Sequence, residues 1–92
     1  MKTIYKYVLK ATDVQTIELP LKSQILSAKV QGNNIVLYAL VEPNEERKEE
    51  YNVLAFGTGH DIAINLSDYS FLDTVLLQNG SLAFHFFYKR VR

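Results

Sequence analysis

The chain has 92 residues, 48% of them hydrophobic, and its ten basic and ten acidic side chains cancel. This length suits one domain with a single core over residues 1–92, and the hydrophobic fraction excludes a disordered chain. The absence of cysteine excludes disulfides and thiolate metal sites. A net charge of zero argues against a generic nucleic-acid binder.

The first ten residues contain Lys2, Lys6 and Lys10, which interrupt the apolar stretch that a signal peptide requires. No apolar run approaches the ~20 residues of a membrane span. We therefore expect a soluble protein located in the cytoplasm.

Apolar and polar residues alternate with the period of two that indicates half-buried strands. In residues 3–9, for example, Tyr5, Tyr7 and Leu9 share one face and the lysines take the other. The predicted strands, in chain order, are residues 3–9, 14–19, 24–30, 35–41, 51–56, 61–66, 71–78 and 81–88. The charged run at 45–50 is predicted to be a solvated hairpin loop.

The last two predicted strands flank Asn79 and Gly80. Asparagine followed by glycine between apolar runs predicts a hairpin with a two-residue type I′ turn, because both residues accept positive φ. Eight short strands at roughly ten-residue spacing, with no helical period, predict an all-β fold. We expect a single-domain antiparallel β-sandwich, Greek-key or jelly-roll-like, with a small barrel as the alternative.

Candidate catalytic residues are few, because the chain has two histidines, His60 in a turn and His85 within a strand. No nucleophile motif and no metal-ligand spacing accompanies them, so we expect neither catalysis nor a metal or cofactor. For His85 we favour a structural imidazole that a neighbouring strand satisfies. An enzyme using His60 with Asp61 is the least favoured alternative.

The turn formed by Gly57, Thr58, Gly59, His60 and Asp61 is the candidate ligand site. Paired glycines allow backbone amides to face an anion, as in phosphate-binding loops. The turn lacks the lysine and the following helix of a nucleotide loop, so an ordinary glycine turn is the favoured reading. If the turn binds a small anionic ligand, we expect basic residues from another strand to contribute.

Basic residues also gather near both ends of the chain, where Lys2, Lys6 and Lys10 precede a tail of Lys89, Arg90 and Arg92. If the terminal strands are neighbours, these side chains form a local cationic patch beside aromatic rings. The competing reading is that lysines protect an edge strand from aggregation.

Two predicted strands are apolar on both faces, whereas a sandwich strand needs only one buried face. Their second faces carry Tyr38 and Leu40 in one strand and His85 and Phe87 in the other. Exposed apolar side chains favour association, so we expect a homo-oligomer, most simply a two-fold dimer, with these four residues at the interface.

Several stretches together resemble a small uncharacterised family of phage- and prophage-encoded proteins of similar length. They are MKTIYKY, IELP, QILSAKVQ, LYALVEP, the GTGH turn and SLAFHFF. The resemblance implies an accessory protein in the host cytoplasm that acts by binding, either inhibiting a host defence or metabolic factor or sequestering a small ligand. A structural or assembly role in the virion is the alternative.

Overall fold

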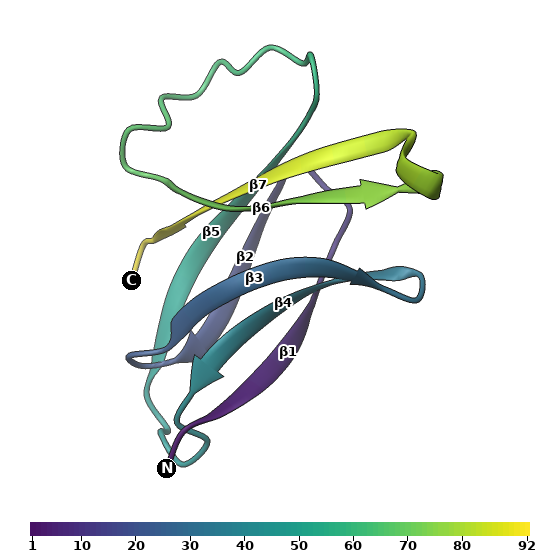
Figure 1. Ribbon diagram of the computed structural model, residues 1–92. Coiled ribbons are helices and arrows are strands. Elements are labelled where there is room, and N and C mark those ends of the chain that lie inside the picture. Colours follow the sequence, from purple (N-terminus) through teal and green to yellow (C-terminus); the bar gives the residue numbers. More distant parts are fainter.

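The computed structural model describes residues 1–92 as seven strands and one short 3-10 turn, with no α-helix (Figure 1). The elements are β1 (Thr3–Leu9), β2 (Val14–Pro20), β3 (Gln24–Gln31), β4 (Asn34–Val41), β5 (Lys48–Gly57), β6 (Ser70–Leu77), η1 (Gln78–Gly80) and β7 (Leu82–Arg90). They form two antiparallel sheets with the orders β1-β4-β3 and β2-β5-β7-β6. The predicted all-β sandwich is confirmed. No helix has the length and hydrophobicity needed to cross a membrane.

The core lies between the inner faces of the two sheets, where the period-two pattern places every second side chain. Strand β4 contributes Leu37, Ala39 and Val41, which are fully buried, and Phe86 of β7 faces them from the other sheet. Burying each large apolar side chain contributes about 1.5–3 kcal/mol, so this layer supplies most of the stabilisation.

The two sheets are joined along one side, where β3 lies beside β6. The Asp73 carboxylate accepts hydrogen bonds from the Ala28 and Thr74 backbone N–H groups and forms an ion pair with Lys29. Along the other side β1 and β2 each keep one edge that pairs with no strand. The sandwich is therefore closed at one side and open at the other.

The closing hairpin forms between β6 and β7, but the prediction of a two-residue type I′ turn is wrong. The strands last pair at Leu77 and Leu82, so four residues form the loop. Asn79 and Gly80 have the expected positive φ, and Gln78 adopts it as well. The Ser81 N–H donates to the Gln78 carbonyl at 3.1 Å, which closes a wider turn.

The predicted strand at 61–66 is wrong, so the sandwich has seven strands and not eight. Residues between β5 and β6 form a long loop that arches away from the sheets (Figure 1). Ile62 and Ile64 are exposed within it. The alternation of these residues is strand-like, but no strand of the chain lies alongside to complete a ladder.

The charged run at residues 45–50 was predicted to be a loop, but only its first part is one, because β5 already begins at Lys48. Glu49 points into the sandwich and is 3% exposed. Its carboxylate accepts hydrogen bonds from the Tyr51 hydroxyl and the Lys22 backbone N–H, and Arg90 Nη1 lies 3.8 Å away. Burial, followed by the hydrogen bond to Glu49, raises the pKa of Tyr51. These hydrogen-bond and charge partners compensate for the cost of burying the Glu49 carboxylate.

Candidate functional site

The glycine turn follows β5 and is a tight β-turn in which the His60 N–H donates to the Gly57 carbonyl at 3.2 Å. Gly59 has a φ of +84°, in the region that glycine tolerates best. The His60 ring lies so close to Gly57 that a Cβ there would come within 2.7 Å of Cε1. Both glycines are thus explained by local geometry, one by its φ and the other by the packed imidazole.

His85 lies on the outer face of β7, held between two threonines. Its Nε2 is 2.7 Å from the Thr58 hydroxyl and its Nδ1 is 2.9 Å from the Thr74 hydroxyl. A neutral imidazole offers one donor and one acceptor, and each hydroxyl can serve either role. His85 is therefore a satisfied structural imidazole, as predicted, and it ties the turn to β6.

A groove of about 340 Å³ lies between the long loop and the four-stranded sheet, at the low end of the size range of ligand sites. We call it the loop groove; it is lined by Asp13, Val14, Ala55, Phe56, His60, Asp61, Ala63 and Ile64. The structure thus brings two predicted site residues, His60 and Asp61, to one concave surface. That surface is mainly apolar with two carboxylates.

A second concave surface, of about 140 Å³, lies on the other side of the same turn. It is lined by Gly57, Thr58, His60, Ser81, Leu82, Ala83 and Phe84. Neither this surface nor the loop groove is lined by a lysine or an arginine. An anion in the loop groove would face Asp13 and Asp61, so the charge there favours a cationic or apolar ligand group.

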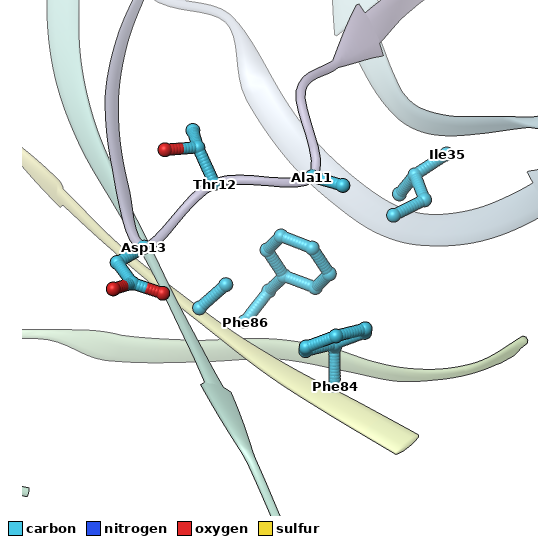
Figure 2. Close-up of a pocket in the computed structure, with 7 residues that line it drawn as sticks. Ala11, Thr12, Asp13, Ile35, Phe84 and Phe86 are labelled. Atoms are coloured by element: carbon cyan, nitrogen blue, oxygen red, sulfur yellow. The ribbon is translucent and has the colours of Figure 1, made fainter. Parts of the chain in front are cut away.

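A small pocket lies beneath the turn between β1 and β2 (Figure 2). Its volume is about 30 Å³, and Phe84 and Phe86 lie across it from Thr12 and Asp13. This volume holds one water molecule and excludes a ligand.

The outer face of the four-stranded sheet carries an aromatic cluster. Phe87 contacts Phe71 and Phe56 edge-to-face, with ring centroids 5.5 and 6.1 Å apart. We define the aromatic face as Val14, Phe56, Phe71, Leu76 and Phe87. Val14, Phe71 and Leu76 are 56%, 57% and 59% exposed. Exposed apolar side chains on one face make it a candidate interaction surface.

The outer face of the three-stranded sheet differs, because the chain partly covers it itself. Lys6 Nζ donates to Gln31 Oε1 at 2.8 Å, and the strand register places Val36 between these two residues. Val36 is only 2% exposed although it points away from the core. Tyr38 and Leu40 beside it are half-buried. The aliphatic part of the Lys6 side chain thus covers apolar surface at Val36 on this outer face.

The four residues predicted for the oligomer interface lie on both outer faces. Tyr38 and Leu40 are on the three-stranded sheet, and His85 and Phe87 are on the four-stranded sheet. These faces point in opposite directions, because the inner faces share one core. A two-fold interface repeats one contiguous patch, so a single interface of this kind does not contain all four residues.

The terminal strands are not neighbours. Strand β1 pairs with β4, whereas β7 pairs with β5 and β6 in the other sheet. The tail is also largely neutralised, because Arg90 lies near Glu49 and Arg92 pairs with Glu50. The lysines of β1 and the basic tail therefore do not form the conditional cationic patch.

No three histidine or acidic side chains converge in the structure, so it contains no cluster that could bind a metal ion.

The sequence analysis did not predict the aromatic face, whose members come from β2, β5, β6 and β7. The apolar second face of the last strand, with Phe87, was the one available signal.

Comparison with known proteins identifies the family. The model of a Domain of unknown function (DUF7352) matches residues 1–92, the entire chain, and the chain belongs to this family. No curated protein and no solved structure matches the chain.

Proposed function

We propose that this member of the DUF7352 family is a non-catalytic accessory protein that acts by binding another protein through the aromatic face. The observation that carries the proposal is the exposure of Val14, Phe71 and Leu76 on the outer face that holds the Phe87 cluster. Aromatic side chains at the centre of an exposed patch supply most of the energy of protein recognition.

The chemistry at the rim of the aromatic face supports recognition of a partner with a basic side chain. Val14 and Phe56 belong both to this face and to the loop groove, which also holds Asp13 and Asp61. A partner segment with an apolar residue next to a lysine or arginine matches this combination of surface and charge. A small anion matches it less well, because no cation lines the groove.

The resemblance to phage and prophage proteins supports an action in the cytoplasm of a host cell. In that setting, a small protein with one apolar face inhibits a host defence or metabolic factor by covering its surface. His85 contributes to this face as a fixed element, since both of its ring nitrogens already have hydroxyl partners.

The test compares partners retained from host lysate by the wild-type chain, by Phe71→Ser and by Ile4→Ser. Both residues are exposed, but Ile4 lies on the opposite outer face and serves as the matched control. We expect a host protein that is retained by the wild type and by Ile4→Ser and lost with Phe71→Ser. Retention of no protein, or equal retention by all three, would contradict the proposal.

A structural or assembly role in the virion is the second candidate, because an exposed apolar face also suits packing against other virion subunits. Mass spectrometry of purified particles separates the two roles. The chain is expected in stoichiometric amounts in particles if it is structural, and to be absent from them if it acts in the host cell.

A further inference from the structure

The long loop contains a segment with a strand pattern and no partner. In residues 61–66, Ile62, Ile64 and Leu66 alternate with polar or small residues. Ile62 and Ile64 are each 46% exposed, and no N–H of this segment donates to a protein group. Apolar alternation with free backbone N–H groups is typical of an unpaired edge strand.

A free edge that suits this segment exists on β1. The three-stranded sheet is one strand narrower than the sheet that it packs against. Strand β1 is the last strand of this sheet, and its outer edge pairs with no strand. Tyr5 is 47% exposed although its register places it on the inner face of β1. A fourth strand beside β1 would cover this open side of the core.

Charge selects β1 over β2, the other free edge. The segment begins with Asp61 and is followed by Asp68, and the loop contains no lysine or arginine. Strand β1 and its flanks carry Lys2, Lys6 and Lys10 and no acidic residue, whereas β2 carries Glu18 and lies between Asp13 and Lys22. Opposite charges across a strand pair stabilise it, and like charges destabilise it.

We propose that residues 61–66 of one copy of this chain add as a strand to the free edge of β1 in a second copy. A two-fold axis then creates the reciprocal contact, so that two copies exchange the segment in a closed dimer. The second copy is the occupant, because in the structure the segment pairs with no strand of its own chain. Asp61 and Ile64 of this segment also line the loop groove beside the aromatic face, but the edge of β1 that would receive the segment lies in the other sheet. The exchange does not depend on the proposed function.

One antiparallel register satisfies both the apolar pattern and the charges. With Ile64 opposite Tyr7, Ile62 lies opposite Leu9 and Leu66 lies opposite Tyr5. All three apolar side chains then extend the inner face of the narrower sheet. The same register sets Asp61 opposite Lys10.

Sedimentation equilibrium tests the proposal with variants that leave the single copy intact, because the altered side chains are exposed in it. We expect a wild-type dimer, about tenfold weaker association with Ile64→Asn, and no change with the control Asn65→Ser, which faces the other side. Lys10→Glu should weaken the dimer, and adding Asp61→Lys should restore it. A wild-type monomer at the highest soluble concentration, or a dimer that is insensitive to Ile64→Asn, would overturn the proposal.

Disulfide trapping locates the contact, since the chain has no cysteine of its own. Oxidation of the double variant Tyr7→Cys/Ile64→Cys should give a covalent dimer. The control Thr16→Cys/Ile64→Cys, which places the second thiol on β2, should give none. A disulfide within one chain, or a dimer dispersed by Phe71→Ser instead, would show that this exchange does not occur.

Discussion

The Asp73 carboxylate accepts a hydrogen bond from the Ala28 backbone N–H at 3.2 Å, and this contact joins β6 of one sheet to β3 of the other. The residue lies at an irregularity in the pairing of β6 with β7, which turns its side chain toward the neighbouring sheet. The Asp73 side chain therefore supplies a polar link between two adjacent strands that share no ladder.

Asp73→Asn is expected to lower the free energy of unfolding by about 1–2 kcal/mol, because charge-assisted bonds to Ala28 and Lys29 are weakened. Burial acts to raise the pKa of Asp73, but the hydrogen bonds from Lys29, Ala28 and Thr74 outweigh it and hold the pKa below the usual value. As the pH falls, the Asp73 carboxylate is therefore protonated in the unfolded chain before it is protonated in the folded chain. The stabilisation is present above a pH of about 4 and is lost as the pH falls through the folded-state pKa.

Urea denaturation at neutral pH and at a pH near 3 measures this effect. Asp68→Asn, in the exposed loop, is the control. The wild type and Asp68→Asn should lose more stability than Asp73→Asn on acidification. An equal loss in all three chains would contradict the role of Asp73.

Gly57→Ala is expected to displace the His60 ring, because the added Cβ would lie 2.7 Å from Cε1. The backbone of Gly57 has no positive φ, so alanine itself fits in β5. The ring can swing outward, so we expect a coupling of about 0.5–1 kcal/mol between the two positions. Denaturation of both single variants and of Gly57→Ala/His60→Ala measures it. Additive effects would show that the ring does not rest on Gly57.

Glu49→Leu is expected to cost about 3–5 kcal/mol, although it places an apolar residue in a buried position. The change leaves the Tyr51 hydroxyl and the Lys22 N–H without their acceptor and Arg90 without its nearest carboxylate. Thermal unfolding compares it with Glu50→Leu, at the neighbouring position on the outer face. Equal costs for the two variants would contradict a special role for the buried carboxylate.

Phe87→Ala is expected to be more destabilising than Phe71→Ala, by about 1–3 kcal/mol. The Phe87 ring packs against both Phe56 and Phe71, whereas the Phe71 ring packs against one aromatic ring, Phe87, and is 57% exposed. Chemical denaturation of the two variants gives the difference. Similar costs would show that the cluster does not organise the aromatic face.

The candidate site was only partly readable from the sequence. The glycine pair and the strand-like order of Ile62 and Ile64 are local signals, and they predicted the turn and marked the loop. The contact of His85 with Thr58 and Thr74 joins three segments, so no spacing along the chain reveals it. The aromatic face is also non-local, since Phe71 and Phe56 both reach Phe87 only because β7 lies between their strands.

Period-two alternation by itself determined the all-β class and the positions of six of the seven strands, including β1 over residues 3–9, because it depends only on neighbouring side chains. The strand at β5 was also predicted, but its predicted start at Tyr51 lies after the observed start at Lys48. The charged residues before Tyr51 favoured a loop, because the burial of Glu49 requires Tyr51 and Arg90 as partners. Tertiary structure alone decided which strands pair, that Asp73 closes one side, and that residues 61–66 stay unpaired. A strand needs a neighbour to complete its hydrogen bonds, and the presence of that neighbour depends on the whole chain.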